Sequence, residues 1–317
     1  MTRNLEAMPL PIVVLYENPD WLPPLEKGLK AEGLDYELHE VWKGIVDPAT
    51  EPDEAIYLNR MSPSSHTRGH LESVDLMIET LAWLEHHGRH VVNGSRAFAL
   101  EVSKLRQDMV LRKHGIQTPT TVLAVGKEAL LEASTRFEGA FITKHNQGGK
   151  GLGIQLFEST EQLEAYLDTD AFDPGPKGQV VLQQYIKPRE PFITRVELVD
   201  GEFLYAMRSD TSQGFELCPS DACQVPPPDV CPVDGSAKFA VSPMTADDPL
   251  VAQYRALCAA EGIAIAGIEF VEDEHGERYT YDINGTTNYN SAVGEAAGVD
   301  GMGVIAKYVA RLAHGGA

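Results

Sequence analysis

The sequence lacks the features of a membrane or secreted protein. It has no run of about 18 apolar residues, so we expect no membrane-spanning helix. Its N-terminus lacks a basic stretch followed by an apolar segment, so we expect no secretory signal peptide. Four cysteines in 317 residues are too few for a disulfide framework, which favours a reducing compartment. These absences together predict a cytoplasmic protein.

Basic residues are also scarce. The chain has 26 Lys and Arg against 47 Asp and Glu, which gives a formal net charge of -21. This negative field repels nucleic-acid phosphates and anionic lipid surfaces, so we expect neither nucleic acid nor membrane as a partner. It would also oppose an anionic nucleotide. A phosphate site in this chain therefore needs a local group of lysines, backbone N–H groups and a bridging cation.

What the chain does contain is an ordinary globular composition, with 43% hydrophobic and 23% charged residues. Strand patterns alternate with helical patterns, which predicts an α/β fold. We expect an α/β lobe over residues 1–95, a linker helix and central lobe over 96–186, and a C-terminal α+β lobe over 187–317. Within them we expect one helix over 99–114, a polar Pro-rich loop up to about residue 242, and a final helix over 303–313.

A lysine and glycine loop follows a predicted strand at residues 144–153, KHNQGGKGLG. Its glycines permit backbone conformations in which consecutive N–H groups point at phosphate oxygens. Lys144, at the end of the strand, would supply a positive charge, and we expect its side chain to face solvent. The alternative is a flexible hairpin loop with a solvated lysine. The P-loop pattern G-x-x-x-x-G-K-[ST] is absent.

Three oxygen-bearing residues favour a divalent cation. Asp282 and Asn284 share one face of a predicted strand because side chains alternate with period 2, and an antiparallel partner strand can bring Glu269 beside them. Mg²⁺ prefers such hard oxygen ligands. Each acid taken alone is more typical of a solvated strand residue, but the three together, after a glycine loop, favour a metal site.

A strand ending in Gln183-Gln184-Tyr185-Ile186 offers backbone groups that can pair with adenine. Arg195 and Arg208, further along, suit phosphate or carboxylate oxygens through bidentate hydrogen bonds. Surface arginines on a hairpin are common, so this segment alone carries little weight.

A cysteine-rich loop leaves two interpretations open. Cys218, Cys223 and Cys231 lie close together and would bind zinc with a fourth ligand from elsewhere, but their spacing is not that of paired C-x-x-C motifs. The alternative is a substrate-facing loop with unreactive thiols. Separately, His66, in the turn with Ser64 and near Arg60, is a candidate for substrate binding.

The order of these parts resembles the ATP-grasp superfamily, and specifically its RimK-type branch of α-L-glutamate ligase-like and glutathione synthetase-like carboxylate–amine ligases. The resemblance covers most of the chain. Beside the glycine loop and QQYI, the motifs that carry it are YLNRMSP (57–63), VNG (92–94), SKLR (103–106), GIQTPT (115–120), TRV (194–196) and DIN (282–284).

The resemblance implies an ATP-grasp fold. Its N-terminal part is a pre-ATP-grasp lobe, the small central lobe carries the glycine-rich flap, and ATP lies between the central and C-terminal lobes. It also implies ATP and Mg²⁺ as cofactors, with two ions expected and Mn²⁺ as a substitute.

The resemblance further assigns the site residues. The nucleotide contacts it implies are Lys104, Lys144, Gly148, Gly149, Gly151, Gln183, Gln184, Tyr185, Ile186 and Glu190. The arginines at the transferring phosphate are Arg195 and Arg208, and the metal ligands are Glu269, Asp282 and Asn284. Arg60, Ser64 and His66 remain as substrate contacts.

Two departures from the family pattern bear on function. The usual metal ligands are Asp and Glu-x-Asn, whereas this chain has Glu269 and Asp282-x-Asn284, so a carboxylate is kept at both places. Residues 209–214 lack the asparagine and basic residues that are usual in the RimK-type pattern, which leaves the substrate unassigned.

The activity implied is ATP-dependent amide formation through an acyl phosphate, from a small-molecule or peptide carboxylate and an amine. A small-molecule kinase, a non-catalytic nucleotide-binding regulator and an unrelated α/β protein are the alternatives. Whether the acceptor is an amino acid, a peptide or a protein tail, and whether the chain forms a homo-oligomer, stays open.

Overall fold

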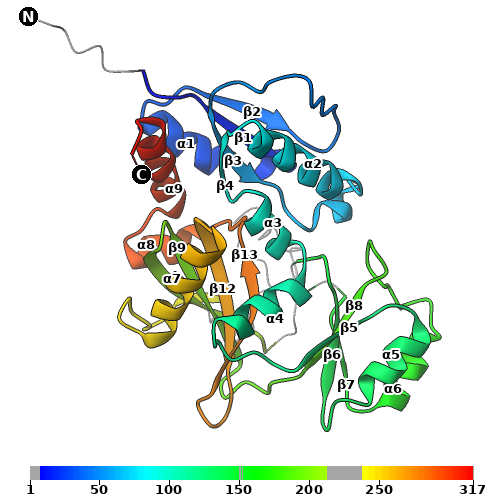
Figure 1. Cartoon of the computed structure of the whole chain (residues 1–317). Helices are drawn as coiled ribbons and strands as arrows, with labels where there is room; N and C mark the ends of the chain where they lie inside the picture. Colours follow the sequence, from blue (N-terminus) through cyan, green and yellow to red (C-terminus); the bar gives the residue numbers. More distant parts are fainter. Residues whose placement is uncertain (1–7, 150, 152, 213–237, 317) are drawn as a thin grey trace, which may run out of the picture.

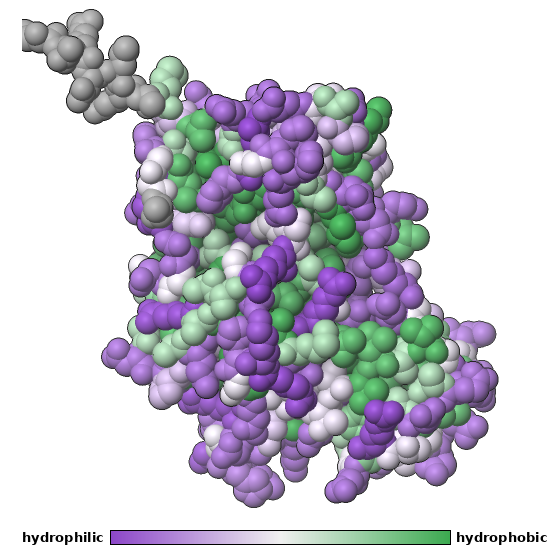
Figure 2. Space-filling view, in the orientation of Figure 1, coloured by the Kyte–Doolittle hydropathy of each residue, from purple (hydrophilic) through white to green (hydrophobic). Residues whose placement is uncertain are grey.

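The computed structural model describes residues 8–149, 151, 153–212 and 238–316. Within them lie three β-sheets, each with helices packed on it, joined by short connections (Figure 1). Hydrophilic side chains cover most of the face shown in Figure 2, in keeping with the large excess of charged acids. No helix in these residues is long and apolar enough to cross a membrane. The cysteines considered for zinc lie outside the described residues.

The N-terminal lobe is built on a parallel sheet in the order β2-β1-β3-β4. Its strand β1 reads IVVLY and is buried on both faces, as a parallel strand covered by helices must be. Ile12 and Val14 point into one core, and Val13 and Leu15 point into another. The elements are β1 (Ile12–Tyr16), η1 (Pro19–Trp21), α1 (Pro23–Ala31), β2 (Tyr36–Glu40), β3 (Ile56–Arg60), η2 (Ser65–Arg68), α2 (Ser73–His86) and β4 (His90–Val92).

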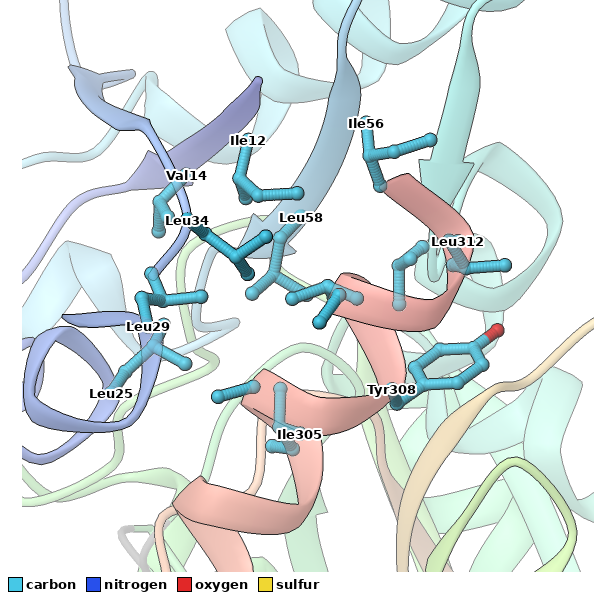
Figure 3. Packing of buried hydrophobic residues seen from close by; sticks show 14 of the residues in the cluster. Ile12, Val14, Leu25, Leu29, Leu34, Ile56, Leu58, Ile305, Tyr308 and Leu312 are labelled. Carbon is cyan, nitrogen blue, oxygen red and sulfur yellow. The ribbon is translucent and has the colours of Figure 1, made fainter. Parts of the chain in front are cut away.

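The last helix of the chain returns to this first lobe. Helix α9 (Gly301–Ala313) packs against α1, and its Ile305, Tyr308 and Leu312 join the core that contains Ile12 and Leu58 (Figure 3). Burying such side chains stabilises the contact by about 1.5–3 kcal/mol each. The C-terminal segment therefore fastens the first lobe to the third.

The central lobe is a small antiparallel sheet in the order β5-β8-β6-β7, with two helices on one side (Figure 1). Strand β6 ends at His145, immediately before the glycine loop, and β8 ends at Gln184, immediately before the connection to the third lobe. The elements are β5 (Thr121–Ala124), α5 (Lys127–Ser134), β6 (Phe141–His145), β7 (Gln155–Phe157), α6 (Thr160–Leu167) and β8 (Val180–Gln184).

The C-terminal lobe is an antiparallel sheet in the order β11-β10-β9-β12-β13. Helix α7 packs on one face through Tyr254 and Leu257, which are fully buried. The elements are β9 (Phe192–Val199), β10 (Glu202–Asp210), β11 (Phe239–Val241), α7 (Pro249–Glu261), β12 (Ile265–Glu272), β13 (Arg278–Asn284) and α8 (Ser291–Ala297).

The structure corrects three sequence-based expectations. The single helix expected over 99–114 is two helices, α3 (Ser95–Glu101) and α4 (Lys104–Lys113). They separate because Ser103 is extended and its side chain accepts a hydrogen bond from the backbone N–H of Arg106, which makes it an N-cap. The loop expected up to residue 242 contains β11, and α8 was not expected at all.

Candidate active site

A cavity of about 260 Å³ lies where the three lobes meet, and most of the predicted site residues line it. The predicted residues on its wall are Ser64, Lys104, Lys144, Gly148, Gly149, Gly151, Gln183, Gln184, Tyr185, Ile186, Arg195, Glu269, Asp282 and Asn284. Residues from the sequence segments around 64, 104, 144–151, 183–195 and 269–284 thus line one cavity.

Strand β12 runs along this cavity and gives it two ends. At its start, the carbonyl of Ile265 accepts a hydrogen bond from Asn93 of the first lobe (2.8 Å). At its end, the carbonyl of Glu272 accepts one from the N–H of Arg189, just past β8 (2.9 Å). At about 3.3 Å per residue the strand spans roughly 23 Å between these contacts. We call these the first-lobe end and the hinge end of the cavity.

Midway between the two ends, Arg195, Glu269 and Asp282 form a row across three adjacent strands. The register pairs Glu269 with Arg195 on β9 and with Asp282 on β13. Arg195 Nη1 donates to Glu269 (2.9 Å), and its Nε donates to the buried Glu197 (2.7 Å). A Cβ at Gly267 would lie 2.2 Å from Arg195 Nη2, so only glycine leaves room for the guanidinium there. The arginine is thus held rigidly in the cavity wall.

A β-bulge turns two consecutive residues of β13 toward the cavity. The register shifts by one residue between Glu269 and Phe270, so Tyr281 and Asp282 both line the wall although side chains normally alternate. Tyr281 Oη donates to Glu269 Oε2 (3.2 Å). The bulge thereby gathers a phenol and two carboxylates at one place.

These oxygens fit a divalent cation. Among the described residues no cluster of three or more His, Cys, Asp or Glu side chains exists, and the donor set here is two carboxylates and one amide. Asn284 donates its Nδ2 to the Gly267 carbonyl (3.3 Å), which leaves its Oδ1 as the group for a ligand. Glu269, Asp282 and Asn284 are thus hard oxygen donors of the kind that Mg²⁺ selects.

The two carboxylates differ in their electrostatic surroundings. Burial raises the pKa of Glu269; the charge of Arg195 opposes this rise, and that of Asp282 reinforces it. Burial also acts to raise the pKa of Asp282, but Lys104 and Lys144 outweigh it and lower that pKa. Lys104 Nζ lies 2.5 Å from Asp282 Oδ1. Asp282 is therefore held as the anion, paired with a lysine.

Lys144 is buried, contrary to the expectation of a solvent-facing side chain. Only 4% of it is exposed, and its Nζ donates to Gln183 Oε1 (2.8 Å). Burial, reinforced by the charge of Lys104, lowers the pKa of Lys144 to about 7. An ammonium group buried in this way is poorly solvated, so an anion that binds beside it would stabilise its charged form.

The glycine loop is fastened at its start to helix α4. Asn146 accepts hydrogen bonds at its backbone carbonyl from Lys104 N (3.1 Å) and at its side-chain oxygen from Leu105 N (3.0 Å). Gly153 has a φ of +74°, and a Cβ there would meet His145 Nε2 at 2.7 Å, so this position requires glycine. The loop approaches the first lobe, where Gln147 Nε2 donates to the Pro63 carbonyl (3.5 Å).

The hinge end has apolar walls and a backbone edge. Ile142, Ile154 and Val271 line it together with the connection after β8. The N–H groups of Gln184 and Tyr185 donate to the carbonyls of Thr120 and Ala140. Ile186, the next residue, also lines the cavity, and its N–H makes no backbone hydrogen bond within the described part of the chain.

Two of the predicted site residues line a second cavity instead. Arg208 and Glu190 line a second cavity, of about 530 Å³, on the opposite face of the C-terminal sheet. Arg208 is paired with Thr194, which alternates with Arg195 along β9, and its guanidinium stacks over Phe192 (4.2 Å to the ring centroid). The structure therefore does not bring Arg208 to Arg195, or Glu190 to the hinge end of the first cavity.

The three candidate substrate contacts also do not all line the first cavity. Ser64 lines the first cavity, whereas Arg60 and His66 do not. Arg60 is buried behind the wall and donates to the Thr287 carbonyl (3.0 Å) and Asn288 Oδ1 (2.7 Å). It braces the wall at the first-lobe end.

Sequence reasoning missed several residues of the wall. Glu101, Thr286 and Asn288 line the first-lobe end, and Trp21 and Ser62 lie there as well. Glu101 stands three residues before Lys104, which is the only local signal that could have singled it out.

Comparison with known proteins identifies the class. Residues 102–216 match the family model of the RimK-like ATP-grasp domain. The solved structure of the ATP-grasp ligase PsnB complexed with minimal precursor superposes with a TM-score of 0.65 at 18% identity, and the match covers 94% of this chain and 97% of that chain. The chain therefore has the ATP-grasp fold.

The curated proteins that the chain resembles are named as ligases. A probable alpha-L-glutamate ligase of Aeromonas salmonicida (strain A449) is 28% identical over 171 residues, 48% of this chain and 55% of that protein. One of Methanococcoides burtonii (strain DSM 6242 / NBRC 107633 / OCM 468 / ACE-M) is 24% identical over 271 residues, 80% of this chain and 83% of that protein. The chain spans about half the length of several curated relatives it matches. These matches confirm the resemblance to RimK-type ATP-grasp proteins that the motifs carry.

Proposed function

We propose that this protein is an ATP-dependent carboxylate–amine ligase that forms an amide or peptide bond through an acyl phosphate. The observation that carries the proposal is the row of Arg195, Glu269 and Asp282 facing two lysines and a glycine loop in one cavity. Such a set neutralises the charge of a transferring phosphoryl group, which is most of what this chemistry requires of a protein.

In the proposed complex ATP lies along β12. The adenine occupies the hinge end between the apolar walls, where the Ile186 N–H can donate to the ring. The phosphates extend toward Lys104, Lys144 and the loop glycines, which supply fixed charges and backbone N–H groups. The buried ammonium of Lys144 gains an anionic partner there.

Glu269, Asp282 and Asn284 would hold Mg²⁺, which when bound neutralises phosphate charge and orients the transferring group. We propose two ions, with Mn²⁺ as a substitute. PsnB has been solved with its precursor variant, Mg and ADP, which supports this assignment by analogy.

The chain's own groups then act on the substrates. Arg195, fixed by Glu197, meets the phosphoryl group as it passes to the carboxylate. The glycine loop, which reaches Pro63 of the first lobe, excludes water from the acyl phosphate. The amine attacks from the first-lobe end, beyond the phosphates. We propose a small-molecule or peptide carboxylate, an amine acceptor and a cytoplasmic location.

The test is a screen of ADP formation against pools of carboxylates and amines, with mass spectrometry of the product. A ligase gives an amide whose formation depends on the added amine. ADP and a stable phosphorylated product without amine dependence would instead identify a small-molecule kinase. Absence of any turnover with both pools and Mg²⁺ would contradict an enzymatic role.

A further inference from the structure

Glu101 is a buried carboxyl group that the chemistry described so far leaves unused. It ends helix α3, is 5% exposed, and still lines the cavity. Its Oε1 accepts a hydrogen bond from the Thr286 N–H (2.8 Å), and its Oε2 lies 3.1 Å from Thr286 Oγ1. A carboxyl group is seldom buried without a reason, because removing it from water is costly.

The contact with Thr286 accommodates both protonation states of this carboxyl. Thr286 Oγ1 also lies 2.8 Å from the Met61 carbonyl, but a hydroxyl has only one hydrogen to donate. With Glu101 ionised, Thr286 can donate to Oε2. With Glu101 protonated, the acid donates to Thr286, which then donates to Met61. Rotation of one hydroxyl therefore satisfies either form.

The position of Glu101 relates it to the acceptor. A Cβ at Gly285, the residue after Asn284, would lie 2.9 Å from Glu101 Oε2. Glu101 thus stands one step beyond the proposed metal ligands, toward the first-lobe end and away from the hinge. Ser62, Ser64 and Asn288 share that end of the wall. In the proposed arrangement this is where the attacking amine enters.

The surroundings of Glu101 bring its pKa close to neutral pH. Burial is the largest influence, and together with the charge of Asp282 on β13 it raises the pKa of Glu101 to about 7. The hydrogen bonds from Thr286 and the charge of Arg60 on β3 act in the opposite direction. An ideal general base has a pKa near the working pH.

We propose that Glu101 binds the ammonium group of the acceptor substrate and removes its proton, which makes it a catalytic residue of the amide-forming step. This inference rests on the proposed ligase function. In the step, Glu101 takes one proton from R–NH₃⁺ and leaves R–NH₂. The nitrogen lone pair forms the C–N bond, and the C–O bond to phosphate breaks with its electron pair on oxygen. The second proton from nitrogen goes to the departing phosphate, and Glu101 later releases its own to solvent.

The competing explanation is that Glu101 only fastens the turn after β13. Glu101→Gln separates the two, because glutamine can still accept from the Thr286 N–H and donate to Thr286 Oγ1. The variant would therefore still hold the turn in place, but it could not remove a proton from the substrate. Glu261→Gln is the matched control, since Glu261 is similarly buried (3% exposed) but pairs with Arg96, Lys113 and His114 and does not line the cavity.

The experiment uses the full chain and a carboxylate and amine found in the screen above. Amide formation is measured across pH, and acyl phosphate formation is measured separately by trapping with hydroxylamine, which is largely unprotonated at neutral pH and needs no base. We expect Glu101→Gln to lower kcat/KM for the amine roughly 100-fold or more, and to lose the pH step near neutrality. Hydroxamate formation stays within about threefold of wild type, as do both reactions of Glu261→Gln.

Other outcomes overturn the inference. Amide formation by Glu101→Gln at the wild-type rate does so directly, and equal losses in both reactions mean that Glu101 acts by positioning. If Glu101→Gln fails to fold, Glu101→Asp decides, because it keeps the base and should keep the pH step at a reduced rate; a flat profile contradicts the proposal. A wild-type protein that yields neither hydroxamate nor amide would instead remove the ligase function on which it rests.

Discussion

Arg195 and Arg208 are both predicted site residues on neighbouring strands of one sheet, yet they lie on opposite faces. Arg195 is 5% exposed and bonded to Glu197 and Glu269, whereas Arg208 stacks on Phe192 in the second cavity. The difference arises from a single extra residue. The register of β9 and β10 pairs Phe203 with Leu198 but Tyr205 with Glu197.

Without that bulge, Arg208 would oppose Ile193, which lines the first cavity, and not Thr194, which lines the second. A one-residue shift moves every later side chain to the other face of a sheet. The residue type therefore suggests that an arginine can bind phosphate, but the register of the strands decides on which face of the sheet it lies.

The largest expected effect is that of Arg195→Met. The change removes the charge that pairs with Glu197 and Glu269 inside the protein, and breaking a buried pair costs about 3–5 kcal/mol. We also expect kcat/KM to fall roughly 10²–10³-fold, since one fixed group at the developing charge is lost. Urea unfolding and ADP release measure the two effects. Activity within about tenfold of wild type would show that Arg195 does not meet the phosphoryl group.

Lys144→Met tests the second cation on the cavity face. The folded protein lowers the pKa of Lys144 from 10.5 to about 7, so the unfolded chain binds more protons between these values. Its contribution to the free energy of unfolding therefore rises with pH in that window. Bound phosphates favour the ammonium, so near about pH 8 ATP binding should take up a proton.

Calorimetry in two buffers of different ionisation heat detects that proton. Wild type should show uptake, while Lys144→Met should show none and lose roughly 100-fold in rate. Equal uptake by both proteins would place the titrating group elsewhere.

Asn284→Asp has a smaller expected effect, because it adds a charge but hardly changes shape. A third anion beside Glu269 and Asp282 should lower the magnesium concentration needed for half-maximal rate and reduce the maximal rate by about tenfold. Asn290→Asp is the control, since Asn290 caps α8 through the Val293 N–H and either residue serves as a cap. Superimposable magnesium titrations of Asn284→Asp and wild type would remove Asn284 from the site.

Arg208→Met should have the smallest effect. Its long apolar side chain can keep the contact with Phe192, and the loss of charge occurs on the face away from the nucleotide. We expect kcat to stay within about threefold of wild type and stability within about 0.5 kcal/mol. A loss comparable to that of Arg195→Met would mean that the second cavity takes part in the reaction.

How much the sequence predicts depends on how local the responsible interaction is. The α/β order and the approach of Glu269 to Asp282 follow from the strand patterns, because alternation and antiparallel pairing are short-range rules. The break at Ser103 could also have been predicted, since serine is a common N-cap.

The remaining features depend on distant contacts. Arg208 was predicted on the wrong face of the sheet because the sequence near Leu204 gives no sign of a β-bulge. Glu101 was missed because its partner, Thr286, lies 185 residues further along the chain. The burial of Lys144 likewise depends on Gln183 and Tyr281, which come from another strand and another lobe.

One feature of the resting cavity bears on how its ligands arrive. Lys104 lies against Asp282, and Arg195 against Glu269, so each residue proposed to meet a phosphate is already paired with one proposed to hold the metal. Under the proposed function we expect the entry of MgATP to exchange these ion pairs, so that the lysine would pair with the phosphate and the aspartate with the cation. Neither partner alone completes the exchange, because each would leave an opposite charge stranded in a buried site. We therefore expect the cavity to bind the complex of nucleotide and metal in preference to either component.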